Sequence, residues 1–170
     1  MKVINLFAGP GAGKSTIRAE LFALLKRAEK RVEEVTEFAK DLTWERHESA
    51  LSDQLYILAN QNRRLDRLRG QVDIVVTDCP IILGLNYTTP DYLPGNFENL
   101  AYELWDTYDN LNFFIRRAKT YQQYGRSQNY WEATLLDDKI SGTLKSRNIP
   151  FLDIRGDSSA AQTIFNTIYE

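Results

Sequence analysis

The chain of 170 residues contains one cysteine, one histidine and one methionine. A single cysteine excludes an internal disulfide, and one cysteine with one histidine gives no basis for a zinc site. No apolar run approaches the ~20 residues of a membrane span, and the short N-terminal apolar run is not a signal peptide. We therefore expect a cytoplasmic protein with no membrane partner.

An excess of positive charge is also missing. The 21 Lys and Arg residues are outnumbered by 23 Asp and Glu residues, which gives a net charge of −2. A chain with this balance is not an electrostatic DNA binder as a whole, so any nucleic-acid contact requires a local patch. Without internal repeats or a linker, the length and the 43% apolar content predict one domain over residues 1–170.

The most informative stretch is a glycine-rich loop that follows the first apolar run. The loop and the residues after it are Gly9, Pro10, Gly11, Ala12, Gly13, Lys14, Ser15 and Thr16. Glycines let backbone N–H groups close on phosphate oxygens, and a helix start adds partial positive charge. We expect Lys14 to reach the β- and γ-phosphates of ATP and Ser15 to hold Mg²⁺. The usual pattern has glycine six positions before the lysine, where this chain has Ala8.

Strand and helix patterns alternate along the chain. Strands are expected over residues 2–7, 31–36, 73–77, 111–115 and 149–154. Helices are expected over about 14–29, 46–69, from the end of an 86–96 loop to about 107, over 130–147, and after Ser158 as an N-cap. Such alternation predicts an α/β fold with a mainly parallel sheet and helices on both faces. Ligands of such sheets bind beyond the carboxyl ends of the strands.

Two acidic residues follow predicted strands at that edge. Asp78 comes directly after the apolar strand 73–77, which suits a ligand of Mg²⁺. Glu37 follows the second strand, where a carboxylate can take the proton from an attacking hydroxyl. Asp41 is the reserve candidate for the role of Glu37.

A basic and aromatic segment over 116–129 follows the fourth strand, and we interpret it as a mobile lid. Arginine stabilises the charge that spreads over a transferring phosphoryl group. We expect Arg117 and Arg126 to close over ATP, with Gly125 as a hinge.

The acceptor side is less defined by the sequence. Gln61 and Arg64 of the helix 46–69 are expected to face the acceptor. Trp44 lies near Glu37 in the sequence and is expected to stack on a base or aromatic ring of the acceptor. Aromatic residues of the loop that follows strand 73–77 are expected either to stack on a ring or simply to pack: Tyr87, Tyr92 and Phe97.

Taken together, these residues resemble P-loop kinases of nucleotides and small molecules, most nearly the ribosylnicotinamide kinase domain and related kinases of bacteriophages. The segments that carry the likeness are 9–16, 37–41, Asp53-Gln54, 77–80 and Arg126. The resemblance implies a three-layer fold with a five-stranded parallel sheet of order 2-3-1-4-5, ATP and Mg²⁺ as cofactors, and an alcohol or phosphate as acceptor.

Deoxynucleoside kinases have a similar layout and use a glutamate after strand two as the base, which corresponds to Glu37. The chain departs from both families after the third strand. Pro80 stands where ribosylnicotinamide kinases have a second aspartate, and the Asp-Arg-Ser of deoxynucleoside kinases is absent.

The leading expectation is an ATP-dependent kinase that phosphorylates a hydroxyl of a nucleoside-type acceptor. Some similar phage kinases phosphorylate 5-hydroxymethyluridine in DNA during thymidine hypermodification, so DNA carrying a modified base is the preferred acceptor. The alternatives are a kinase of a free nucleoside or nucleoside monophosphate, and a non-kinase P-loop NTPase switch. A DNA acceptor predicts a basic track from Arg63, Arg64, Arg67 and the lid, whereas a free nucleotide predicts a closed pocket under residues 86–97.

Overall fold

The computed structural model describes residues 1–89, 91–122, 124 and 128–169. Within these residues a single sheet contains the strands β1 (Lys2–Phe7), β2 (Val32–Val35), β3 (Ile74–Thr77), β4 (Asp109–Arg116) and β5 (Leu152–Arg155). Their order is β2-β3-β1-β4-β5, and every neighbouring pair is parallel. The predicted fold class and strand order are confirmed.

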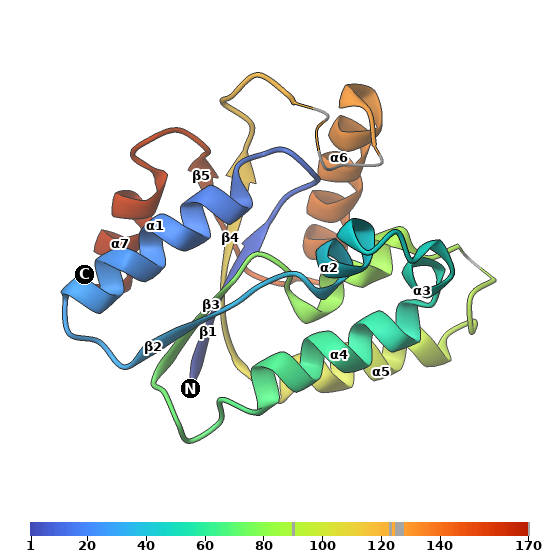
Figure 1. The fold of residues 1–170 in the computed structure, drawn as a ribbon, viewed down its shortest axis with the longest axis horizontal. Helices are drawn as coiled ribbons and strands as arrows, with labels where there is room; N and C mark the ends of the chain where they lie inside the picture. The colour runs from blue at the N-terminus through green and yellow to red at the C-terminus, as the bar shows by residue number, and fades with distance from the viewer. Residues whose placement is uncertain (90, 123, 125–127, 170) are drawn as a thin grey trace.

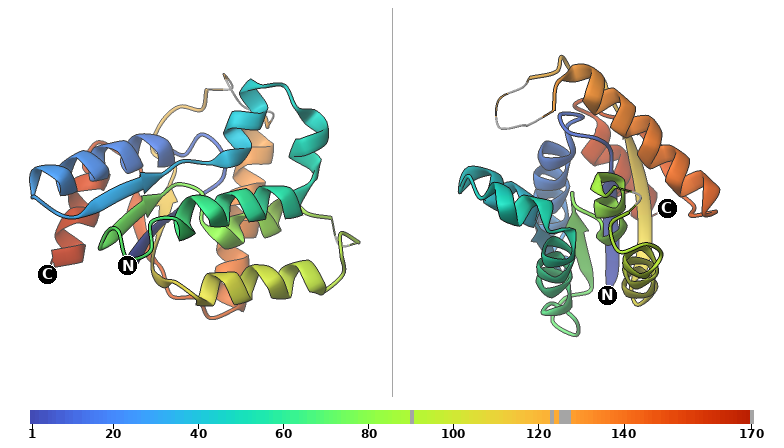
Figure 2. Two further views of the ribbon diagram at one scale, coloured as in Figure 1. Left: turned by 60° about the horizontal axis from the view of Figure 1, so that its bottom comes forward. Right: turned by 90° about the vertical axis from the view of Figure 1, so that its right-hand side faces the viewer.

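The connections are helical and cover both faces of the sheet (Figures 1 and 2). They are α1 (Lys14–Arg27), α2 (Phe38–Trp44), α3 (Glu48–Ser52), α4 (Gln54–Asp66), the 3₁₀ helix η1 (Ile81–Tyr87), α5 (Asn96–Asp106), α6 (Tyr130–Ser146) and α7 (Ala160–Tyr169). Helices α1 and α7 pack together on one face, and α4, α5 and α6 lie on the other. None of the helices in the described part of the chain has the length and apolar character needed to cross a bilayer.

The alternating side chains of the central strand β1 build a core on each face. Val3 and Phe7 belong to the apolar cluster under α4, α5 and α6, where the Phe7 ring meets Trp105 edge-on. Ile4 and Leu6 point the other way, into the cluster under α1 and α7. Because both faces are buried, the strand is apolar except for Lys2 and the buried Asn5, and its carboxyl end presents the glycine loop at the edge of the sheet.

The single helix predicted over 46–69 is wrong. The chain forms the short helix α3 there and restarts as α4 after Asp53, whose Oδ1 accepts a hydrogen bond from the Tyr56 amide at 3.0 Å. This side-chain cap satisfies an amide that the helix itself cannot, so the helix begins anew at Gln54. Leu55, in the first turn of α4, is exposed.

Two boundaries near the C-terminus also differ from the prediction. Strand β5 begins at Leu152 rather than at residue 149. The last helix begins at Ala160, and Ser158 does not cap it. Asp157 stabilises the turn before this helix, because its Oδ1 accepts hydrogen bonds from the amide and the hydroxyl of Ser159.

Candidate active site

The loop between β1 and α1 wraps around the start of α1. Gly11 and Gly13 have φ values of 77° and 105°, in the left-handed region that favours glycine. The Lys14 ammonium donates hydrogen bonds to the carbonyls of Ala8 and Gly9, at 2.7 and 3.1 Å. Ala8 is fully buried and has no positive φ, so an alanine methyl fits where the usual pattern has glycine.

Helix α6 closes on the back of this loop through Asp137. The Asp137 Oδ1 accepts a hydrogen bond from the Gly9 amide at 2.6 Å, and its Oδ2 accepts one from Arg117 Nε. Arg117 also donates to the Ala133 carbonyl at 3.0 Å, and its buried Nη1 has no hydrogen-bond partner in the described chain. A Cβ at Gly9 would lie 2.6 Å from the Ala133 carbonyl oxygen, so only glycine allows this approach.

Asp78 directly follows β3 and is buried. Its Oδ1 is buried and accepts no hydrogen bond from any described residue, and the nearest cation is Arg18 Nη1 at 3.6 Å. No cluster of three His, Cys, Asp or Glu side chains occurs in residues 1–89, 91–122, 124 and 128–169. A buried carboxylate oxygen with spare hydrogen-bonding capacity fits Mg²⁺, which takes few protein ligands and otherwise binds water and phosphate.

Glu37 lies between β2 and α2 and lines a cavity together with Lys14 and Ser15. Burial raises the pKa of its carboxyl above the ordinary value, and the Lys14 ammonium opposes part of that rise. A carboxylate in this position is a stronger base than one in water, because the proton it takes up relieves a buried charge.

Gln61 and Arg64 of α4 do not line this cavity; they hold the turn that carries Glu37. Gln61 is 2% exposed, its Oε1 accepts a hydrogen bond from the Phe38 amide at 3.0 Å, and its Nε2 donates to the Thr36 carbonyl at 3.3 Å. Arg64 donates to the Thr36 hydroxyl at 2.9 Å. It also pairs with the carboxylate of Asp41, the reserve candidate for the base.

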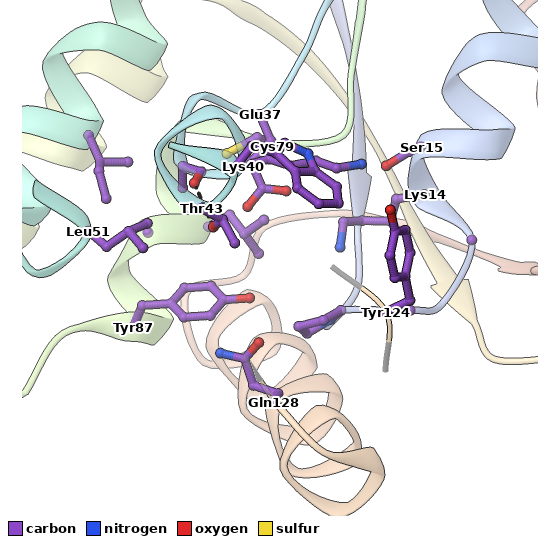
Figure 3. A pocket seen from close by; sticks show the side chains of 18 of the residues that line it. Lys14, Ser15, Glu37, Lys40, Thr43, Leu51, Cys79, Tyr87, Tyr124 and Gln128 are labelled. Carbon is purple, nitrogen blue, oxygen red and sulfur yellow. Dashed lines mark hydrogen bonds between the residues drawn. The ribbon is translucent and has the colours of Figure 1, made fainter. Parts of the chain in front are cut away.

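The cavity has a volume of about 520 Å³ and extends from the glycine loop to α2, α4 and η1 (Figure 3). Its walls away from the loop combine apolar and polar side chains. Tyr87 points its hydroxyl into the space, and burial raises the pKa of that hydroxyl, so it remains a neutral donor. The buried thiol of Cys79 also has a raised pKa, which makes it a small apolar wall residue rather than a nucleophile.

The structure brings together most of the residues expected at the site. The loop residues Pro10, Gly11, Gly13, Lys14, Ser15 and Thr16 line the cavity with Glu37, Trp44 and Tyr87. Trp44 is 54% exposed and its ring lies 5.8 Å from that of Tyr124. Arg117 lies behind Gly9 instead of in the cavity lining, and Arg126 and Gly125 lie outside the described residues.

Several lining residues were missed by the sequence reasoning. They are Ala39, Lys40, Thr43, Leu51, Gln54, Ile57, Leu83, Gly84, Gln122 and Gln128. Lys40 and Thr43 follow Glu37 at one-turn spacing on α2, and this periodicity would have placed them on the side of Glu37. Nothing local to the others indicates a cavity, because they meet only through the packing of α2, α3, α4, η1 and the segment between β4 and α6.

A glycine loop at the carboxyl edge of a parallel sheet, with a carboxylate facing it, defines a phosphate-binding α/β domain. Residues 3–160 match the family model AAA_28, described as an AAA domain, and the chain belongs to that family. No curated protein matches the chain.

The fold is shared with deoxyadenosine kinase from M. mycoides. One solved structure of that enzyme holds the products dCMP and a flexible dCDP, and another holds dATP. Each is 18% identical to this chain with a TM-score of 0.62; coverage is 99% of both chains for the first and 100% of both for the second. Identity at this level establishes the common fold.

Proposed function

We propose that the protein is an ATP-dependent kinase that transfers the γ-phosphate to a hydroxyl of a nucleoside-type acceptor. One observation carries this proposal: the Glu37 carboxylate lines the same cavity as Lys14 and Ser15 of the glycine loop. A phosphate loop alone suits any nucleotide hydrolase. A buried carboxylate facing the loop, in a cavity of about 520 Å³, suits an enzyme that binds a second substrate beside ATP.

The glycine loop is the donor half of the proposed site. Backbone amides at the start of α1 and the Lys14 ammonium bind the β- and γ-phosphates. To do so, Lys14 exchanges its hydrogen bonds to the carbonyls of Ala8 and Gly9 for phosphate oxygens. Ser15 and Asp78 hold Mg²⁺, which when bound neutralises charge on the transferring phosphates.

Glu37 is the acceptor-side catalytic residue in this proposal. It orients the acceptor hydroxyl toward the γ-phosphate and receives its proton. The raised pKa of Glu37 brings its basicity closer to that needed near neutral pH. Catalysis then consists mainly of positioning and of charge stabilisation, to which Lys14 and the lid residue Arg126 contribute. Arg117 instead supports the loop from behind through Asp137 and the Ala133 carbonyl.

We prefer 5-hydroxymethyluridine in DNA as the acceptor. Trp44 and Tyr124 support this choice, since both line the cavity, expose most of their ring surface and lie in contact with each other. Exposed aromatic rings at the mouth of a polar cavity suit the stacking of bases that neighbour the reacting nucleotide. The hydroxymethyl group would enter the cavity toward Glu37 while the flanking bases remain at the mouth.

A free nucleoside or deoxynucleoside monophosphate is the second candidate, and a specific contact favours it. Arg64, expected in a basic DNA track, is engaged by Asp41 and Thr36 instead. The structural relatives named deoxyadenosine kinase, with deoxynucleotides bound, point to the same class of small acceptor.

A transfer assay with γ-labelled ATP distinguishes these functions. The panel contains DNA with 5-hydroxymethyluracil, unmodified DNA, free nucleosides, nucleoside monophosphates and a sample without acceptor. Label on the modified DNA alone supports the preferred acceptor, and activity on it should fall steeply with salt. Label on small molecules only supports the second candidate. Free phosphate released equally with and without acceptors overturns the kinase proposal in favour of an NTPase switch.

A further inference from the structure

Arg18 lies between two carboxylates beneath the glycine loop. Its Nη1 is 3.6 Å from Asp78 Oδ1, and its Nε is 3.5 Å from Glu34 Oε2. Only 12% of the Arg18 side chain and 4% of the Asp78 side chain are exposed. The three side chains come from α1, β2 and the end of β3 and form a row of negative, positive and negative charge, which is buried at Asp78 and Arg18 and 30% exposed at Glu34.

The register of the sheet explains why these residues meet. Glu34 pairs with Val76 of β3, and Asp78 follows two residues after Val76, on the same face. That face is covered by α1, since Val76 belongs to the core cluster under this helix. Arg18 is three residues after Ser15 and four after Lys14, so it shares one side of α1 with both loop residues.

The row is incompletely bonded. Arg18 Nε, Arg18 Nη1, Glu34 Oε2 and Asp78 Oδ1 are all buried, and none has a hydrogen-bond partner among the described residues. Buried polar atoms are normally hydrogen-bonded, so four such atoms in one cluster require an explanation. At 3.6 Å from Arg18 Nη1, Asp78 Oδ1 is within ion-pair distance of Arg18 but forms no hydrogen bond with it.

We propose that Arg18 is a positioning residue that aims the Asp78 carboxylate at the metal of the ATP complex, while Glu34 holds Arg18 back from closing on Asp78. This inference rests on the proposed function, because it assumes that Mg²⁺ binds with ATP at Ser15 and Asp78. A single helix then carries both the lysine and serine of the loop and the cation that orients the acidic partner. Residues that orient a metal ligand from behind commonly affect metal affinity as strongly as some ligands do.

Direct metal binding tests the inference. Mn²⁺ is titrated, with detection by electron paramagnetic resonance, into the full chain saturated with ADP. Arg18→Met keeps the length of the side chain and removes its charge, and it should weaken Mn²⁺ binding by about 10–100-fold. Arg18→Lys restores a cation at the same place and should recover most of that loss. Binding of ADP in excess chelator should not change in either variant, because the Arg18 guanidinium pairs with Asp78 and Glu34 and has no role in holding the nucleotide in this proposal.

Arg27→Met on the exposed end of α1 is the matched control and should bind Mn²⁺ like the wild type. Thermal unfolding of each variant identifies a loss that comes from unfolding, and Arg18→Lys keeps the test valid if Arg18→Met is unstable. Unchanged Mn²⁺ affinity in Arg18→Met, or an equal loss in the Met and Lys variants, overturns the role of Arg18. Neither outcome touches the kinase proposal, which is judged by phosphate transfer in the wild-type protein.

Discussion

Gln61 forms hydrogen bonds with the backbone on both sides of Glu37. One side-chain amide accepts a hydrogen bond from the residue after Glu37 and donates one to the residue before it, at 3.0 and 3.3 Å. Both bonds act on the turn rather than on the carboxylate, so Gln61 fixes where Glu37 stands and leaves its oxygens available to the cavity.

Gln61→Leu should therefore lower kcat more than it lowers the affinity for ATP. The leucine fills a similar volume but leaves the Phe38 amide without its acceptor and the Thr36 carbonyl with only the bond from Arg64 at 3.4 Å among the described residues, which costs about 1–3 kcal/mol of stability. A base displaced by about 1 Å loses roughly 10²-fold in rate. Steady-state kinetics of phosphate transfer and calorimetric ATP binding measure the two effects.

Asn60→Leu is the control for that variant. Within the part of the chain that the structure describes, its side chain bonds only to the Tyr56 carbonyl of its own helix, so kcat should stay at the wild-type value. A Gln61→Leu protein with wild-type kcat would show that the turn holds Glu37 without help from α4.

Replacing Glu37 by glutamine should stabilise the protein in a pH-dependent way. Burial raises the pKa of this carboxyl above 4.5, so the folded protein binds the proton more tightly than the unfolded chain. The wild type therefore loses stability as the pH rises from that value through the raised pKa, and Glu37→Gln does not. The advantage of the variant in free energy of unfolding should grow over this window and be constant above it.

Urea unfolding of both proteins over a series of pH values from about 4 to 8 measures that difference. A difference that is the same at every pH would mean that the pKa of Glu37 is equal in the folded and unfolded states.

Gly9→Ala should destabilise the protein and Gly142→Ala should not. A methyl group at Gly9 meets the Ala133 carbonyl oxygen at 2.6 Å, and because that atom is backbone either the loop or α6 must shift. Such overpacking costs about 1–3 kcal/mol, and it should also weaken ATP binding by moving the loop. Gly142 lies in α6 with open space around it, so alanine there should gain about 0.5–1 kcal/mol. Thermal unfolding compares the two, and equal stabilities would contradict the close contact between the loop and α6.

Trp44→Ala tests what the exposed ring at the cavity mouth does. If the acceptor is a base within DNA, the substitution should raise the KM for DNA by about 5–150-fold, corresponding to about 1–3 kcal/mol of lost stacking. The KM for ATP should not change, because Trp44 lies on the acceptor side of the cavity. A KM for DNA equal to that of the wild type would assign Trp44 to packing against Tyr124 alone.

The glycine-loop side of the cavity could be predicted from the sequence because most of its residues are contiguous. The glycine loop, Lys14 and Ser15 occupy one stretch of chain, and Asp78 and Glu37 each follow a recognisable strand. Parallel strands place their carboxyl ends at one edge, so position along the chain already implied position in space.

The side of the cavity away from the glycine loop could not be predicted in the same way. The polar residues of α4 were expected to face the substrate, yet Gln61 is buried on the same face as Leu58 and Leu65, where its side-chain amide binds the Glu37 turn. Arg18 and Asp137 were missed because their partners lie far along the chain, on β2, β3 and the glycine loop. Such pairs depend on how helices dock on the sheet, which no local pattern encodes.

The turnover of Glu37→Gln, measured beside its affinity for ATP, tests the central claim most directly. Wild-type protein should transfer label from γ-labelled ATP to a nucleoside-type acceptor, and Glu37→Gln should lower kcat by about 10²–10⁴-fold while binding ATP as tightly as the wild type. Undiminished transfer by Glu37→Gln would contradict the assignment of the cavity as a site where Glu37 activates the acceptor.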